Sequence, residues 1–120
     1  MDSIASPAAL QGVRVIEMGQ LIAGPFCGKT LGEFGADVIK IEAPETGDPL
    51  RNWRLIKEGT SVWWQVQSRN KRSVALDLRQ KEGQDIARQL IAEADVLVEN
   101  FRPGTCLLYT SDAADEEDSV

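Results

Sequence analysis

The stretch GVRVIEMGQLIAGPFCGKTLGEFGADVIKIE, residues 12–42, decides the fold. Residues 13–17 are rich in β-branched side chains and have a glycine on either side, which predicts a buried strand. Residues 25–34 carry apolar side chains at a spacing close to one helical face, with a proline at the start and a glycine just after the end. Residues 37–42 (DVIKIE) predict a second strand. A strand, a helix and a strand in this order are typical of an α/β unit.

The following sequence continues the same alternation. Residues 43–59 contain two prolines and two glycines, and we expect a long loop there. Residues 73–78 predict a third strand, residues 81–94 a helix with an apolar stripe, and residues 96–100 a fourth strand. This order predicts an α/β fold, a Rossmann-like half-domain built on a parallel sheet.

Loops that follow parallel strands are the places to look for a ligand site. In open α/β sheets, ligands bind beyond the carboxyl ends of the strands. Residues 20–25 follow the first predicted strand and residues 100–104 follow the fourth. If the strands are parallel, these two loops meet at one edge of the sheet.

Composition limits the classes of function. A chain of 120 residues allows one domain, and 42% apolar with 27% charged residues is typical of globular proteins. The net charge of -6 comes mainly from residues 106–120, without which 14 acids face 13 bases, so neither a nucleic-acid surface nor a strongly acidic one is indicated. No apolar run approaches the roughly 20 residues of a membrane span, and residues 1–9 do not resemble a secretory signal. We expect a cytoplasmic location.

Metal and thiol chemistry are not indicated. The chain has no histidine, and its two cysteines, Cys27 and Cys106, have no CxxC spacing, so we expect neither a metal site nor a redox motif. Cys27 lies on the predicted apolar helix face and is interpreted as an inert core thiol. Trp53, Trp63 and Trp64 are interpreted as core or interface packing, with an acyl pocket as the alternative.

An ordered set of motifs between residues 10 and 105 resembles the class III CoA-transferases, the family of formyl-CoA and carnitine-CoA transferases. The motifs are LQGVRVIE (10–17), AGP (23–25), LGEFGADVIKIE (31–42), GDPLR (47–51), NKRS (70–73), LDL (76–78) and ENFRPG (99–104). No single motif is decisive, but their order and spacing are specific. The resemblance implies the N-terminal, CoA-binding part of a fold in which two ring-shaped chains interlock as a homodimer. We expect residues 1–9 to be a disordered leader. Residues 106–120 break the pattern, and CLLYTSDAADE is similar to translated sequencing-adapter sequence, so we expect this tail to be artefactual.

The resemblance also implies the residues that contact coenzyme A. The small residues at 23–25 let a ligand approach the backbone at a helix start, where free N–H groups favour anions. Cationic side chains suit the phosphates, Asn100 offers both a donor and an acceptor, and Phe101 suits adenine or pantetheine. Ala43 stands where some members carry an arginine that contacts CoA. The implied contacts are Ile22, Ala23, Lys71, Arg72, Leu76, Asp77, Leu78, Arg79, Asn100, Phe101 and Arg102.

By resemblance, the enzymes move CoA from an acyl-CoA to a carboxylic acid through an aspartate nucleophile. In family members that aspartate lies downstream of the fourth strand, so we assign no catalytic residue here and expect the chain alone to be inactive. CoA and acyl-CoA enter as substrates, and no prosthetic group is implied. The acyl donor and acceptor stay open. The alternatives are an α-methylacyl-CoA racemase-like fragment and a non-catalytic nucleotide-binding module. The stretch at 44–68 and Asn100 favour the transferase over the racemase.

Overall fold

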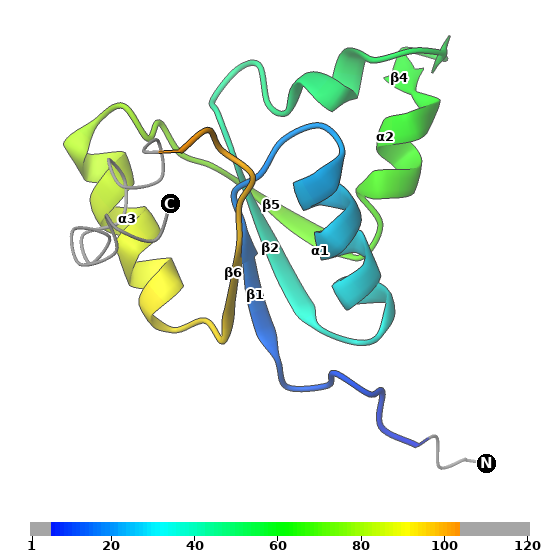
Figure 1. Cartoon of the computed structure of the whole chain (residues 1–120). Coiled ribbons are helices and arrows are strands. Elements are labelled where there is room, and N and C mark those ends of the chain that lie inside the picture. Colours follow the sequence, from blue (N-terminus) through cyan, green and yellow to red (C-terminus); the bar gives the residue numbers. More distant parts are fainter. Residues whose placement is uncertain (1–5, 104–120) are drawn as a thin grey trace.

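Four parallel strands form the centre of the molecule. They are β1 (Arg14–Glu17), β2 (Asp37–Glu42), β5 (Lys71–Ala75) and β6 (Val96–Val98). The computed structural model describes residues 6–103, and in this part of the chain the strand order is β5-β2-β1-β6. Helix α1 (Ala23–Glu33) covers one face of the sheet, and helix α3 (Lys81–Ala92) covers the other (Figure 1). The predicted α/β fold with a parallel sheet is confirmed.

The α3 face of the sheet is apolar. Because side chains alternate between the two faces of a strand, Ile16 and Met18 at β1 lie on the same side as Ile39 and Ile41 of β2. Ala87 of α3 is fully buried against them. Further residues pack around this cluster: Val74, Leu76, Leu78, Leu90, Ile91, Ala94 and Phe101. The amphipathic stripe predicted for the second helix therefore meets the sheet as expected.

The α1 face changes character along the strands. In their amino-terminal half, Val15 and Val38 form a small apolar cluster with Ala36. Two residues further along each strand, the same face presents Glu17 and Lys40, both buried. The sheet therefore buries charge on this face.

Helix α1 approaches this face closely because its buried positions are small. They are Gly24, Pro25, Gly28 and Gly32. A Cβ atom on Gly28 would overlap the Glu17 carboxylate.

The apolar face predicted from Phe26, Cys27, Leu31 and Phe34 is mostly wrong, because Phe26 and Phe34 are more than half exposed. Cys27 is also exposed, so its thiol is not the core thiol that the sequence predicted.

The third strand lies two residues earlier than predicted. Residues 73–78 were the predicted strand, whereas β5 pairs with β2 in the register Val38↔Lys71 to Glu42↔Ala75. The strand ends because β2 ends. The Leu76 N–H makes one last bond to the Glu42 carbonyl, at 3.0 Å, and the chain then turns at Asp77, whose Oδ1 accepts from the Arg79 N–H. Residues 76–79 are thus a loop at the carboxyl edge of the sheet.

The predicted loop at 43–59 contains regular structure. It includes the 3-10 helix η1 (Pro49–Asn52) and β3 (Ile56–Lys57), which forms a hairpin with β4 (Thr60–Ser61). Helix α2 (Val62–Gln67), which the sequence did not predict, follows directly. The Ser61 side chain caps it by accepting from the Trp64 N–H.

The three tryptophans pack within this hairpin and helix region. The Trp53 and Trp63 ring centroids are 5.7 Å apart, and the Arg51 guanidinium lies 4.1 Å from the Trp64 ring centroid. All three side chains are half-buried. These positions agree with a packing role for the three tryptophans. None of the three lines either of the two clefts described below.

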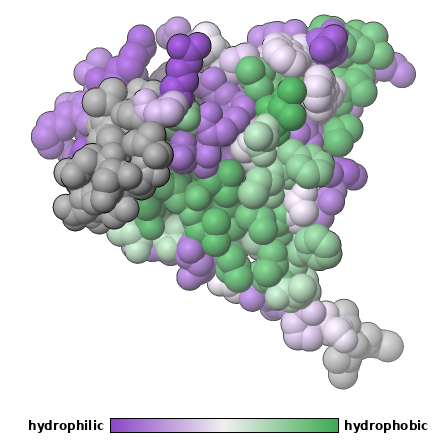
Figure 2. Space-filling view, in the orientation of Figure 1, coloured by the Kyte–Doolittle hydropathy of each residue, from purple (hydrophilic) through white to green (hydrophobic). Residues whose placement is uncertain are grey.

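Apolar side chains also reach the surface at the β6 edge of the sheet. Figure 2 shows them gathered over β6 and α1, and Val96, Leu97, Ile22 and Phe26 are exposed there. Strand β6 is the last strand on its side of the sheet within residues 6–103. In the same range, no helix is long and apolar enough to span a membrane.

Candidate functional site

Two clefts adjoin at the carboxyl edge of the sheet. The first, of about 500 Å³, is lined by Met18, Gln20, Ile41, Glu42, Ala43, Pro44, Glu45, Thr46, Leu76, Asp77, Leu78, Arg79 and Phe101. The second, of about 410 Å³, is lined by Gln20, Leu21, Ile22, Ala23, Asn100, Phe101 and Arg102. Gln20 and Phe101 belong to both clefts, which therefore form one extended depression. Both volumes lie in the range of small-molecule sites.

Nine of the eleven coenzyme contacts implied by the sequence line these clefts. They come from three separate segments, the loops after β1, β5 and β6. The first cleft holds Leu76, Asp77, Leu78 and Arg79, the second holds Ile22, Ala23, Asn100 and Arg102, and Phe101 is shared. The convergence of the loops after β1 and β6 at one edge is as expected for parallel strands.

The other two implied contacts, Lys71 and Arg72, do not line either cleft. Both lie at the start of β5, two residues before the predicted start of the third strand. The Lys71 side chain is buried, with Nζ 2.7 Å from Glu17 Oε1 and donating to the Pro25 carbonyl at 2.8 Å. Arg72 is exposed and paired with Asp37 at the amino end of β2, at 2.8 Å. A phosphate contact by either residue stays a prediction that this geometry does not support.

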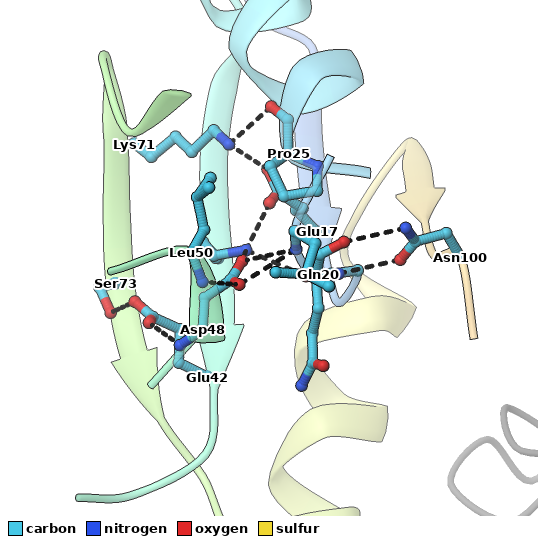
Figure 3. Close-up of polar contacts among 12 residues, drawn as sticks. Glu17, Gln20, Pro25, Glu42, Asp48, Leu50, Lys71, Ser73 and Asn100 are labelled. Carbon is cyan, nitrogen blue, oxygen red and sulfur yellow. Dashed lines mark hydrogen bonds and ion pairs between the residues drawn. The ribbon is translucent and has the colours of Figure 1, made fainter. Parts of the chain in front are cut away.

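Asn100 is bound to the loop that follows β1. Its Oδ1 accepts from the Gln20 N–H at 2.9 Å, and its Nδ2 donates to the Gln20 carbonyl at 3.0 Å (Figure 3). Two bonds to one residue imitate the pairing of neighbouring strands and join the loops on either side of the second cleft. No room remains for a Cβ at Gly19, which would meet the Asn100 side chain.

A buried ionic cluster, which we define as Glu17, Lys40, Asp48 and Lys71, lies directly under the loop after β1. Lys40 Nζ is 2.7 Å from Glu17 Oε2 and 2.9 Å from Asp48 Oδ2. Lys71 Nζ binds the other oxygen of Glu17 (Figure 3). Two acids face two bases, so the cluster is neutral overall, as burial of charge requires.

Burial lowers the pKa of Lys71, and the ion pair with Glu17 opposes that change. Sequence reasoning did not identify this cluster as part of the site. The signal was present, because Glu17 and Lys40 are charged residues inside apolar strands, where charge is rarely found without a partner.

Glu42, which lines the first cleft, is held by three groups. Its Oε1 accepts from the Asp48 N–H and from Arg51 Nε, both at 2.8 Å. Its Oε2 accepts from Arg51 Nη2 at 2.8 Å and from Ser73 Oγ at 2.6 Å (Figure 3). Burial raises the pKa of this carboxyl, but these hydrogen bonds outweigh burial and hold the pKa at about 2, below its ordinary value of 4.5.

Asp77 and Arg79 form a small charged turn at the same cleft. Asp77 Oδ1 accepts from Arg79 Nε at 3.1 Å as well as from the Arg79 N–H at 3.0 Å, and these bonds lower the pKa of Asp77. The side chain of Arg79 is largely exposed and borders the cleft. Among residues 6–103, no group of three or more potential metal ligands occurs.

The chain belongs to CoA-transferase family III, which its sequence matches over residues 10–115. Succinyl-CoA–D-citramalate CoA-transferase of Chloroflexus aurantiacus is 50% identical over 106 residues, 88% of this chain and 26% of that protein. Formyl-CoA:oxalate CoA-transferase of Escherichia coli is 44% identical over 96 residues, 79% of this chain and 23% of that protein. The resemblance drawn from the motifs is therefore confirmed.

A solved structure agrees with the fold. A CAIB/BAIF family protein from Brucella suis superposes with a TM-score of 0.78 at 41% identity, over 87% of this chain and 29% of that chain. The chain thus spans about a quarter of the length of the curated relatives it matches.

Proposed function

We propose that this chain is the part of a CoA-transferase that binds the coenzyme, in an enzyme that moves CoA from an acyl-CoA to a carboxylic acid. One observation carries the proposal. Nine residues implied by the family motifs, from three loops distant in sequence, line two adjoining clefts at the carboxyl edge of a parallel sheet. The names of the relatives support the reaction class, since each of those reported above is a CoA-transferase.

The clefts suit an elongated ligand that carries phosphates. Arg79 borders the first cleft and Arg102 the second, and a guanidinium binds phosphate through two parallel N–H bonds. Phe101 lies between them and offers an aromatic face to adenine or pantetheine. Helix α1 begins at Ala23, which lines the second cleft, and its N-cap residue Ile22 makes no side-chain capping hydrogen bond, so this helix start suits an anionic group of the ligand.

We propose that the nucleophile is not among the described residues. The first cleft contains the carboxylates of Glu42 and Asp77, but Glu42 is held by Arg51 and Ser73, and Asp77 is bonded to Arg79. In the proposed reaction an aspartate attacks the acyl-CoA carbonyl and expels the CoA thiolate, which leaves an acyl-aspartyl anhydride. The thiolate then attacks the aspartyl carbonyl, expels the first carboxylate and forms an aspartyl-CoA thioester. The acceptor carboxylate attacks the aspartyl-CoA carbonyl and expels the thiolate, which leaves a second anhydride. The thiolate then attacks the acceptor carbonyl of this anhydride, forms the new acyl-CoA and releases the aspartate.

Assembly and location are further parts of the proposal. The family resemblance supports an interlocked homodimer of the longer enzyme, and we propose a cytoplasmic location. A Chloroflexus aurantiacus relative, 50% identical over 106 residues, is named as the beta subunit of a succinyl-CoA–L-malate CoA-transferase, so that protein assembles with another chain. The acyl donor and acceptor stay open.

The binding part of the proposal is tested by titrating CoA into the ¹⁵N-labelled chain. We expect shifts in the amide signals of residues 20–23, 76–79 and 100–102, with a dissociation constant above about 1 μM, because few of a full site's contacts are available. Arg79→Ala should weaken binding about tenfold, as the loss of one charge-assisted phosphate contact predicts. Arg72→Ala is the matched control and should stay within about twofold. A stronger effect at Arg72 than at Arg79 would overturn the placement of the phosphates.

The reaction part is tested by incubating the chain with acyl-CoA donors and carboxylate acceptors. We expect no transfer above background and no covalent adduct by mass spectrometry. An acyl-enzyme adduct would contradict the assignment of the nucleophile to another segment. Exchange of the α-proton of a 2-methylacyl-CoA, measured in deuterated water with the longer gene product, would instead support the racemase alternative.

A further inference from the structure

The loop between β1 and α1 carries backbone strain beside the second cleft. Leu21 has a φ of +67°, in the left-handed region that residues other than glycine rarely adopt. A residue stays in this conformation only where surrounding contacts over-determine it. Ile22 and Ala23, which follow directly, line the second cleft and begin α1. The conformation of Leu21 therefore sets the direction in which these two residues leave the sheet.

Two members of the buried ionic cluster hold this loop by its backbone. Lys40 Nζ donates to the carbonyl of Gly19 at 3.0 Å. The N–H of Leu21 donates to Asp48 Oδ1 at 3.0 Å. The two contacts lie on either side of Gln20, whose own backbone is bound by Asn100 as described above. Three consecutive residues of the loop, Gly19, Gln20 and Leu21, are thus held by side chains from other segments.

The side chains of Lys40 and Asp48 reach the second cleft through this loop. Each side chain is 1% exposed, and neither lines either cleft. The Lys40 ammonium has three N–H donors, and they meet the carboxylate of Glu17, the carbonyl of Gly19 and the carboxylate of Asp48. A change in the ion pair of Lys40 and Asp48 therefore alters the position of the loop, and it affects a bound ligand through the loop.

We propose that Asp48 is a positioning residue of the coenzyme site. Paired with Lys40, it holds Leu21 in the left-handed conformation and so directs Ile22 and Ala23 toward the ligand. This inference rests on the proposed function, because it takes CoA as the ligand of the second cleft. The buried carboxylate of Asp48 then influences the affinity of the site for CoA, although it does not contact the coenzyme.

Asp48 also has a contact with a purely structural role, and the test must separate its effect from that of the Leu21 contact. Its Oδ1 accepts from the Leu50 N–H at 2.9 Å and so caps η1. Asp48→Ala removes the cap, the Leu21 contact and the charge together. Asp48→Asn keeps one oxygen as an acceptor for both N–H groups, but it replaces Oδ2, the atom that faces Lys40, with an NH2 donor, so it loses the charge and the ion pair with Lys40.

The first arm of the test needs no ligand. Amide hydrogen exchange of the labelled chain is expected to show Leu21 exchanging at least about tenfold faster in Asp48→Ala than in the wild type, relative to Ile39 in β2. Asp48→Asn should show a smaller increase. Asp85→Ala, which removes an exposed carboxylate paired with Lys81 on α3, is the matched control and should leave Leu21 unchanged.

The second arm measures CoA affinity in the same variants. Asp48→Ala should weaken CoA binding about tenfold, Asp48→Asn less, and Asp85→Ala by less than about twofold. Should Asp48→Ala fail to fold, the double variant Lys40→Met with Asp48→Leu removes both charges together, a change that proteins often tolerate in stability. Fast Leu21 exchange and weak CoA binding in that folded variant would support positioning.

The two arms separate this inference from the proposed function. Unchanged Leu21 exchange in the variants overturns the positioning role, whether or not CoA binds. Fast exchange with unchanged CoA affinity overturns the link from loop to ligand. If the wild-type chain shows no CoA-dependent shifts at the clefts, the proposed function fails, while the exchange arm still decides whether Asp48 holds the loop.

Discussion

On the α3 face of the sheet, β2 presents aliphatic side chains such as Ile39 to an amphipathic helix. On the α1 face, the neighbouring residue Lys40 meets Glu17 of β1 under a helix whose buried residues are glycines and a proline. The same strands build both faces, since successive side chains point to opposite sides. Figure 1 shows the two helices on either side of the sheet.

The two faces differ in what they determine. Apolar burial is non-directional, so the α3 face tolerates changes of shape as long as volume is kept. Ion pairs and hydrogen bonds have fixed partners, so the α1 face specifies where the backbone of the loop after β1 lies. Glu17 and Lys40 lie in the half of their strands nearest the clefts, where position matters for binding. We infer that the α3 face contributes mainly to the stability of the fold, whereas the α1 face fixes the position of the loop after β1.

The largest expected effect comes from breaking the charge balance of the α1 face. Lys40→Met leaves Glu17 and Asp48 buried with only Lys71 to neutralise them, and we expect it to lower the free energy of unfolding by about 4 kcal/mol. Urea denaturation measures the change. Arg72→Met removes an exposed pair and should cost less than about 1 kcal/mol. Equal costs for the two variants would mean that burial does not distinguish these pairs.

The second effect is the pH dependence contributed by Glu42. Its pKa of about 2 in the folded chain is below the ordinary 4.5, so the ionised carboxylate favours the folded state above about pH 4.5. That contribution, roughly 3 kcal/mol, should be lost as the pH falls from about 4.5 toward 2. Glu42→Gln should be less stable near neutral pH and show a shallower acid dependence in urea denaturation. A wild-type slope retained in this variant would assign the acid sensitivity to other carboxylates.

The third effect tests how closely α1 packs on the ionic cluster. Gly28→Ala places a methyl group against the Glu17 carboxylate and should cost about 2 kcal/mol in thermal or urea unfolding. Gly32→Ala is the matched control on the same helix face, because its Cβ would lie 3.3 Å from the Asn70 Cβ, and alanine favours the helix by about 1 kcal/mol. It should be close to neutral. A destabilised Gly32→Ala with a normal Gly28→Ala would contradict the packing described.

The smallest effect belongs to the apolar face. Ile39→Val removes one buried methylene from the α3 face and should lower the free energy of unfolding by about 1 kcal/mol. The Leu21 amide should keep its wild-type exchange rate relative to β2, because the cluster on this face does not include Gly19, Gln20 or Leu21. If Leu21 exchange in Ile39→Val rose as much as in Asp48→Ala, the result would contradict the inference that only the α1 face fixes the position of the loop.

The elements that the sequence predicted well are those whose apolar pattern matches their burial. DVIKIE became β2 within its predicted bounds, and the helix predicted at 81–94 became α3. Helix α1 was found for partly wrong reasons, since its glycines and Pro25 face the sheet and Phe26 faces solvent. Helix α2 was missed because its six residues are too short to establish a periodicity.

Family motifs implied the residues that line the clefts, but they did not reveal the buried ionic cluster beneath the loop after β1. The loops after the first and fourth strands were predicted to meet at one edge of the sheet, and residues 22–23 and 100–102 line one cleft there. Residues 76–79, which only the family motifs implied, line the adjoining cleft. Lys71 was predicted to contact a phosphate of the coenzyme, because the sequence does not show that β5 begins at that residue and turns its side chain toward Glu17.

The sequence by itself determined the family, the α/β alternation and the segments that reach the clefts, because these depend on local pattern and on ordered motifs. Only the tertiary structure decided that Glu17, Lys40, Asp48 and Lys71 neutralise one another. These residues lie up to 54 positions apart in the chain, from Glu17 to Lys71, and they are brought together by strand register and, for Asp48, by the loop before η1. The physical reason is that a buried charge is stable only beside its partner, and which residues become neighbours is settled by the sheet.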